Sequence, residues 1–450
     1  MASRTCLLVL TAAALISAAE SDESFQPPGQ HPALLLNARR LRLLRRERER
    51  QSPRWQQFES FITGNASLPE PGFALALYYQ AAEDQAAGRR AVEWALGDGS
   101  DLRQLALVFD WCQPVMSAQQ SAALGRKLES ALDRPPQSSA IPEARSRIFA
   151  AIAVADRAPK LAEREIQRAV VTWFRGELAT ALQSGHNVVA RADQYPLLEI
   201  LHAIRDNLGI DLREAVPDYF KQLATCDLLS YYPAPNAAPE NDYRIPASRS
   251  GEPAIKTAIL ARAADLALVA YDSNALGSQF LQGWLIQDRF VMRAAFGAPY
   301  EFLWANPYLP GAGFDRAPLS VHDALLGRLF VRSTWGDDAL WAGYFDGQLQ
   351  VFAAGVAKMA GTKSMRALRI GDTVIAPAAA PSSPVFDAPL GELFLIGLKP
   401  SHAYLLTAGR YKTRKEAADP GGIIGLTFQP EFHGAIRIRE AGPSAGSATQ

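Results

Sequence analysis

The chain has 450 residues, of which 48% are hydrophobic and 20% charged, enough for a sizeable core and for about two to three domains. Lysine plus arginine equals aspartate plus glutamate at 46 each, so the formal net charge is zero. This balance excludes a global attraction to nucleic acid or to a membrane surface, and we expect neither as a partner. A local basic run within residues 39–50 is typical of a solvated helix face.

Residues 1–19 have the pattern of a secretory signal peptide. Arg4 supplies the positive start, Cys6–Ile16 is a short apolar stretch, and Ser17 to Ala19 are small residues suited to cleavage. The stretch is too short to cross a bilayer, and no later segment is long and apolar enough, so we expect no membrane span. The sequence therefore predicts a secreted or periplasmic protein.

The predicted mature chain keeps two cysteines, Cys112 and Cys226. Both lie in helical apolar patterns, which predicts two buried free thiols, with a disulfide as the alternative in an exported compartment. Two cysteines and scattered histidines give no zinc-ligand spacing, so we predict no metal site. Nothing in the pattern demands a cofactor.

Helical patterns dominate residues 31–320. Asn37 and Ser117 are good N-caps, Ser52 precedes a helix that opens at Pro53, and Gly209 ends another helix. Short connections make neighbouring helices antiparallel hairpins, and no fixed repeat length stands out. We interpret residues 31–320 as an α/α toroid domain. After the first two helices, further ones are expected at residues 72–84, 86–97, 101–112, 117–133, 142–156, 159–183, 193–208, 211–229, 253–271 and 277–296.

Short strands follow a Pro- and Gly-rich run at residues 307–319. Asp346 and Gly347 are a strong hairpin signal between two of these strands. Residues 328–440 are interpreted as an antiparallel β-sandwich domain, and residues 441–450 as a disordered tail. The predicted fold class is thus α+β and multidomain. Strands are expected at residues 329–333, 339–345, 348–352, 367–370, 373–375, 393–397, 402–407, 423–428 and 434–438.

Two polar loops among the helices are the natural places for chemistry. The first contains Gly185, His186 and Asn187, for which a helix C-cap followed by a turn is the alternative interpretation. The second, residues 233–252, contains Tyr243 and Arg244 and is too polar to be core. The glycine patterns of serine hydrolases, phosphate loops and dinucleotide-binding folds do not occur in the chain.

Four segments resemble the heparinase II/III and alginate-lyase group of polysaccharide lyases. They are HPALLLNARRLRLL followed by SPRWQQF, LALVFDWCQPVMSAQQSAAL at residues 105–124, the Gly185–Asn187 turn, and RSTWGDDALWAGYFDG at residues 332–347. The resemblance covers most of residues 31–350. It implies a toroid followed by a β domain, and an acidic polysaccharide or oligosaccharide as the partner.

The resemblance also implies β-elimination of a uronic-acid glycoside. In that reaction a hydrogen-bond donor neutralises the uronate carboxylate, and a base removes the neighbouring C5 proton. Asn187 and His186 are the candidate neutraliser and helper. Tyr243 or Tyr232 is the candidate base or acid, and Arg244 would grip a carboxylate.

Two other functions remain open at this point. A glycoside hydrolase on the same fold would use paired carboxylates, for which Asp110, Asp193 and Asp242 are candidates. A catalytically silent relative would hold a sugar chain by stacking it on aromatic side chains. The second alternative is favoured by residues 343–352, which contain no histidine where those lyases often carry one.

Overall fold

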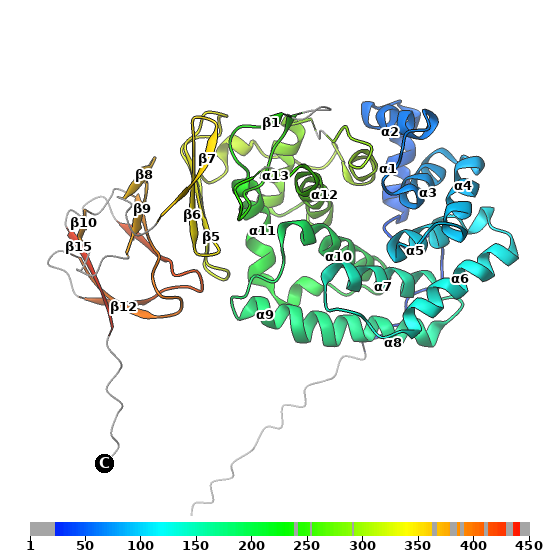
Figure 1. Ribbon diagram of the computed structural model, residues 1–450, viewed down its shortest axis with the longest axis horizontal. Coiled ribbons are helices and arrows are strands. Elements are labelled where there is room, and N and C mark those ends of the chain that lie inside the picture. Colours follow the sequence, from blue (N-terminus) through cyan, green and yellow to red (C-terminus); the bar gives the residue numbers. More distant parts are fainter. Residues whose placement is uncertain are drawn as a thin grey trace, which may run out of the picture.

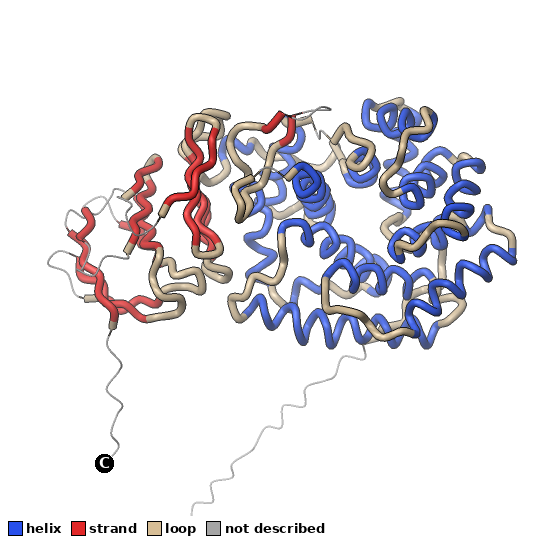
Figure 2. Tube along the Cα trace, in the orientation of Figure 1, coloured by secondary structure: helices blue, strands red, loops and turns tan. Residues whose placement is uncertain are grey.

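A computed structural model describes residues 23–237, 242–252, 254–289, 292–361, 367–378, 385–387, 391–408, 413–428 and 435–441. The protein is α+β, with helices in its N-terminal part and β-sheets in its C-terminal part (Figure 1). The two kinds of element are segregated along the molecule (Figure 2). The predicted signal peptide at residues 1–19 lies outside the described residues, as does the predicted tail after residue 441.

The helices begin where the sequence places capping residues. Asn37 accepts a hydrogen bond from the Arg40 amide, and Ser117 forms a capping box with Gln120. The helices of the described part are α1 (Ala38–Glu49), α2 (Pro53–Thr63), α3 (Pro71–Ala82), α4 (Gln85–Leu96), α5 (Leu102–Trp111), α6 (Ala118–Asp133), α7 (Ile141–Ala153), α8 (Pro159–Gln167), α9 (Ala179–Gln183), α10 (Gln194–Leu208), α11 (Pro217–Ser230), α12 (Ile255–Tyr271), α13 (Leu276–Gln287) and α14 (Ala298–Trp304). Shorter or irregular turns are η1 (Gln113–Val115), the π segment η2 (Arg168–Leu178), η3 (Arg191–Asp193), η4 (Leu212–Ala215) and η5 (Phe314–Arg316).

These bounds confirm the predicted helices, with two exceptions. The helix expected at residues 211–229 begins only at Pro217, because Val216, with φ of −149°, separates it from the turn η4. The helix expected at residues 277–296 ends at Gln287, and α14 begins only at Ala298. Arg289 adopts a left-handed conformation with φ of 55°, which an α-helix does not tolerate. Pro299 then lies in the first turn of α14. Backbone N–H groups there have no acceptor within the helix, so the missing N–H of proline costs no hydrogen bond.

Alternate helices contact one another in a closed order. α3 contacts α5, α5 contacts α7, α7 contacts α10, α10 contacts α12, α12 contacts α14, and α14 returns to α3. The intervening helices, such as α4, α6 and α13, pack outside these. We call the six helices of this closed order the inner helices.

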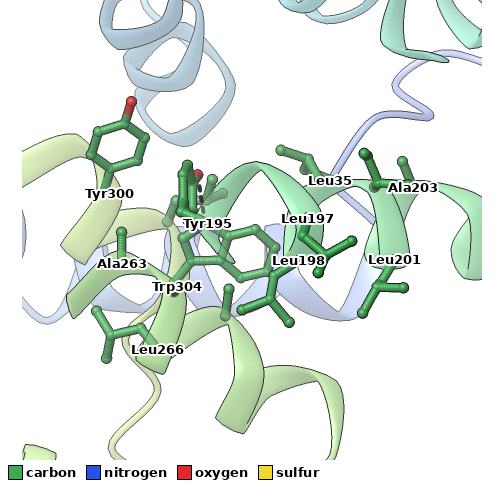
Figure 3. Close-up of a cluster of buried hydrophobic side chains, with 14 of the residues drawn as sticks. Leu35, Tyr195, Leu197, Leu198, Leu201, Ala203, Ala263, Leu266, Tyr300 and Trp304 are labelled. Carbon is green, nitrogen blue, oxygen red and sulfur yellow. Dashed lines mark hydrogen bonds between the residues drawn. The ribbon is translucent and has the colours of Figure 1, made fainter. Parts of the chain in front are cut away.

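Buried aromatic and aliphatic side chains form a cluster where α10, α12 and α14 meet (Figure 3). Trp304 donates its indole N–H to the Tyr195 hydroxyl at 3.0 Å. Tyr195 in turn donates to Glu199 at 2.8 Å. Glu199 is fully buried and receives Arg103 from α5 at 2.6 Å and Arg145 from α7 at 3.0 Å. A buried ion cluster therefore joins the inner helices.

Within the described residues the C-terminal strands form three sheets. Their orders are β3-β4-β5-β6-β7, β14-β11-β9-β8 and β10-β15-β12-β13. All neighbouring strands are antiparallel except β9 and β11, which run parallel. The strands are β3 (Ser320–Asp323), β4 (Arg328–Arg332), β5 (Trp341–Phe345), β6 (Gln348–Ala353), β7 (Val356–Ala360), β8 (Leu368–Ile370), β9 (Thr373–Pro377), β10 (Val385–Asp387), β11 (Gly391–Ile396), β12 (Ala403–Ala408), β13 (Arg414–Ala417), β14 (Ile424–Phe428) and β15 (Ala435–Glu440). A short ribbon of β1 (Asn236–Ala237) and β2 (Asp242–Tyr243) lies among the helices.

The sheets stack as successive layers on the helical part (Figure 1). One face of the β3–β7 sheet joins the helical core through Phe330 and Trp341. Its other face packs on the β8-containing sheet, as Tyr344 and Ile375 share one cluster. The far side of that second sheet packs on the third. A sheet covered on both faces explains the continuous apolar run of β11, which does not alternate.

Two contacts fix the β part to the helices, one from the first sheet and one from the loop between β13 and β14. The indole N–H of the fully buried Trp341 donates to the Leu229 carbonyl on α11 at 2.8 Å. Gly185, just after α9, approaches Pro420 so closely that an added Cβ would lie 2.4 Å from the proline Cγ. The helical and β parts therefore share one buried boundary.

The predicted free thiols are confirmed, since Cys112 and Cys226 are both buried and unpaired. None of the described helices has the length and apolar character needed to cross a membrane.

Candidate functional site

A cavity of about 370 Å³ lies where the helices meet the β3–β7 sheet, and we call it the interface cavity. Its lining comes from the 187–194 loop, the end of α11, the 245–257 segment, and strands β4 and β5. Its volume lies within the usual range of small-molecule sites, about 300–1,000 Å³. Its charged and amide-bearing lining residues are Asn187, Arg191, Gln194, Asp227, Arg249, Glu252, Arg328 and Asp346.

Arg191 joins two buried carboxylates at this cavity. Its guanidinium lies 2.9 Å from Asp227 Oδ2 on α11 and 2.9 Å from Asp265 Oδ1 on α12. The Tyr231 hydroxyl donates to Asp265 Oδ2 at 2.6 Å, and the Gln194 amide donates to Asp227 Oδ1 at 3.1 Å. Arg191 thus bridges two buried carboxylates, while Arg328 also acts on Asp227 and Arg262 on Asp265.

This arrangement perturbs Asp227. Burial raises the pKa of its carboxyl to about 6, opposed by Arg191 and assisted by the Asp265 carboxylate. Asp227 is only 3% exposed, yet it lines the cavity. A carboxyl with a pKa close to neutrality at a cavity can give or take a proton at physiological pH.

Two further arginines of the cavity differ in their pairing. Arg328, at the start of β4, is held by Asp323 at 2.6 Å. Arg249 is exposed and forms no ion pair with any residue that the structure describes. Arg249 is therefore a cation free to bind a ligand carboxylate.

The Gly185–Asn187 turn is a helix C-cap, as its alternative interpretation predicted. Gly185 has φ of 80° and its amide donates to the Leu182 carbonyl, while the His186 amide donates to the Ala181 carbonyl. This cap places the exposed Asn187 on the lining of the interface cavity. His186 is also exposed and does not line that cavity.

The two candidates on the second loop lie elsewhere. Tyr243 is buried at 4% exposure and pairs with Asn236 in the β1–β2 ribbon. Arg244 lies 2.9 Å from Asp337 and also contacts Asp288. Neither Tyr243 nor Arg244 lines the interface cavity, so the structure does not bring them together with Asn187.

Arg244 lines a smaller cavity of about 170 Å³, which we call the arginine–tryptophan cavity. Trp284, Trp335 and Tyr232 also line it. Arg332 stacks on Trp335, 4.1 Å from its ring centroid. Burial lowers the pKa of Arg332 to about 10, and the nearby Arg244 adds to this effect. The volume is below the usual range for a complete ligand site, so this cavity fits at most part of a ligand.

The carboxylates considered for hydrolysis lie outside the interface cavity. Asp110 is buried and accepts hydrogen bonds from the Ala33 and Leu34 amides and from His31 at 2.6 Å. That role is structural, since it ties the N-terminal segment to α5. Asp193 ends the η3 turn, and Asp242 is exposed on β2.

Arg191, Asp227 and Arg249 were not among the candidates from the sequence. For Asp227 a signal was present, because a single acid inside the apolar run of residues 223–229 must be paired or functional when buried. For Arg191 and Arg249 there was none, since surface loops carry arginines routinely. Their importance depends on neighbours from distant parts of the chain.

Within the described residues, no group of three or more histidine, cysteine, aspartate or glutamate side chains is arranged to hold a metal ion. A comparison of the chain with models of known protein families and with curated proteins finds no match.

Proposed function

We propose that the protein is a secreted or periplasmic relative of the heparinase II/III and alginate-lyase group that cleaves a uronic-acid polysaccharide or oligosaccharide by β-elimination. The observation that carries this proposal is the lining of the interface cavity. An amide at Asn187, a cation at Arg249 and a carboxyl of raised pKa at Asp227 line one cavity. These are the groups that β-elimination next to a carboxylate requires.

The proposal also includes two features of the fold, an α/α toroid and a β-sandwich. The closed order of contacts from α3 through α14 and back to α3 supports an α/α toroid. The face-to-face packing of the three sheets supports a β-sandwich extended by one further layer. An active cavity between such a toroid and its β domain fits the residues that line the interface cavity.

The reaction assigns one task to each group. Asn187 and Arg249 bind the uronate carboxylate and stabilise the enolate-like charge that develops on it. Ionised Asp227 removes the C5 proton. The electron pair forms the C4–C5 double bond, the C4–oxygen bond breaks, and the leaving oxygen takes a proton from a donor or from water. Neither Tyr232 nor Tyr243, the tyrosines expected from the sequence, lines the interface cavity, so the proposal assigns that proton to water. Arg244 would bind a carboxylate only in the arginine–tryptophan cavity.

Hydrolysis is the second candidate because Asp227, Glu252 and Asp346 all line the interface cavity. A carboxyl of raised pKa paired with an ionised carboxylate is the usual arrangement of a glycosidase. In that case Asp227 would protonate the leaving oxygen instead of removing a carbon-bound proton.

The test is to incubate the purified protein with a panel of uronic-acid polysaccharides and to follow both ultraviolet absorbance and new reducing ends. β-elimination produces both signals, and hydrolysis produces reducing ends without absorbance. Asn187→Ala should abolish cleavage, while Asn274→Ala, an exposed asparagine outside the cavity, should leave it unchanged. Binding without either signal would identify a silent relative, and absence of both binding and cleavage on every substrate would sink the proposal.

A further inference from the structure

A second cavity of about 380 Å³ lies beside α1, and we call it the α1 cavity. It is at the opposite end of the inner helices from the interface cavity. On α10, Gln194 lines the interface cavity and Arg205 lines the α1 cavity. These residues are eleven positions apart, which corresponds to about 17 Å along a helix. On α12, likewise, Thr257 lines the interface cavity and Ala270 lines the α1 cavity. The α1 cavity is therefore a separate place on the molecule.

Its lining is strongly basic. Arg39, Arg42 and Arg46 lie on one face of α1, at the i, i+3 and i+7 spacing. All three are exposed, and none forms an ion pair with a described residue. Arg40 and Arg205 complete the set, and no aspartate or glutamate belongs to the lining. The basic run expected to be a solvated helix face thus borders a cavity.

Arg40 is held in position within the cavity. Its guanidinium lies 4.1 Å from the Trp304 ring centroid and donates to the Leu35 carbonyl. A second nitrogen lies 3.4 Å from His202 Nδ1, and His202 Nε2 donates to the Ala267 carbonyl at 2.9 Å. His202 therefore accepts at Nδ1. A guanidinium fixed by uncharged partners needs no rearrangement before it binds an anion.

Two carboxylates border the lining. Glu47 lies 3.4 Å from the Tyr308 hydroxyl and is paired with Arg54, and the other is Asp206. Asp206 accepts a hydrogen bond from Asn37 at 3.0 Å and lies 3.8 Å from Arg205, and neither carboxylate is part of the lining. Two carboxylates, one of them already paired with Arg54, stand beside five arginines, so the cavity keeps a positive excess. The C-terminal ends of α10, α12 and α14 carry partial negative charge and balance part of this excess. Arg205, for example, donates to the Tyr271 carbonyl at the end of α12. These ends do not involve the three exposed arginines of α1.

We propose that the α1 cavity is a binding site for a compact oxyanion, a phosphate or sulfate group, carried either free or as an ester on a sugar. Guanidinium groups match the oxygens of such a group with paired hydrogen bonds. Tyr308, 52% exposed at the rim, offers a ring on which an attached sugar can stack. The site is independent of the proposed lyase chemistry.

The test is isothermal titration of the full chain at constant ionic strength, set with chloride. The probes are inorganic phosphate, inorganic sulfate, glucose 6-phosphate, glucose 6-sulfate and glucuronate. We expect saturable binding of at least one phosphate or sulfate probe and much weaker binding of glucuronate. Tighter binding of the inorganic ions would identify a free ion as the ligand, and tighter binding of the esters a sugar ester.

The variant pair makes the assignment specific. Arg42→Gln with Arg46→Gln should weaken binding by roughly tenfold or more. Arg89→Gln with Arg90→Gln removes the same charge from an exposed face of α4 and should change binding by less than about twofold. Equal losses in the two double variants, no saturable binding, or a preference for glucuronate would overturn the proposal. Asn187→Ala should leave oxyanion binding intact, so failure of the lyase proposal would remain distinguishable.

Discussion

Asp227 is the residue of the interface cavity whose protonation changes near neutral pH. If it removes the C5 proton, cleavage should rise as pH increases through about 6, because only the ionised form is a base. Asp227→Asn should lower kcat/KM by roughly 10²–10⁴-fold and remove the acid limb of the profile. Asp218→Asn, at an exposed position of the same helix, is the matched control. A pH profile unchanged by Asp227→Asn would contradict this role.

Glu199 is the carboxylate shared by both arginines of the buried ion cluster. Burial alone would raise its pKa, but Arg103 and Arg145 outweigh burial and hold the pKa below its usual value. Because the folded state favours the ionised form, this stabilisation is complete above the unfolded-state pKa and is lost as pH falls through the folded-state value. Glu199→Gln should lower the free energy of unfolding by about 3–5 kcal/mol, since Arg103 stays buried without its partner.

Urea unfolding at neutral and acidic pH checks this expectation. Glu163→Gln, on the exposed face of α8, is the control and should stay within about 0.5 kcal/mol of the parent. If Glu199→Gln were no less stable than the control, the cluster would not contribute to the stability of the helices.

At the scale of elements, the turn after α9 links a helix cap to the contact between helices and sheets. Gly185 and Gly209 both have positive φ, 80° and 71°, but only Gly185 has a close neighbour, Pro420. Gly209→Ala should therefore cost about 1–2 kcal/mol for its backbone alone. Gly185→Ala should cost clearly more, because its Cβ would also collide with Pro420. Guanidinium unfolding measures the difference, and equal losses would show that the boundary yields without strain.

The elements differ in how far the sequence predicts them. Helices with a capping residue, such as those that begin after Asn37 and Ser117, can be located from the local sequence, because the cap itself marks the first turn. Strands β7 and β13 were not predicted, because they are largely exposed and lack an apolar face. The interface cavity could be anticipated only at Asn187. The grouping of Arg191, Asp227 and Asp265 arises from tertiary contacts that no local pattern contains.

At the scale of the whole molecule, Trp341 joins the first sheet to the helices. Trp341→Ala should lower the free energy of unfolding by about 3–5 kcal/mol, through the cavity left behind and the lost bond to the Leu229 carbonyl. It should also separate the unfolding of the helices from that of the sheets, each followed by the hydrogen exchange of its own peptides along a thermal ramp. Trp341→Phe, which keeps most of the apolar volume, is the control. Coincident transitions in Trp341→Ala would show that the boundary does not depend on this side chain.

The rates at which the two described cysteines react with a thiol reagent can report which part of the native molecule opens first. Cys226 is 1% exposed on the lining of the interface cavity, whereas Cys112 follows α5 inside the helical core. Burial raises the pKa of Cys226 to about 12 and that of Cys112 further, so neither thiol reacts with an alkylating reagent until it becomes exposed. Time-resolved labelling, assigned by peptide mass, should modify Cys226 faster than Cys112 if the boundary opens before the helices unfold. Equal labelling rates would mean that helices and sheets open only together.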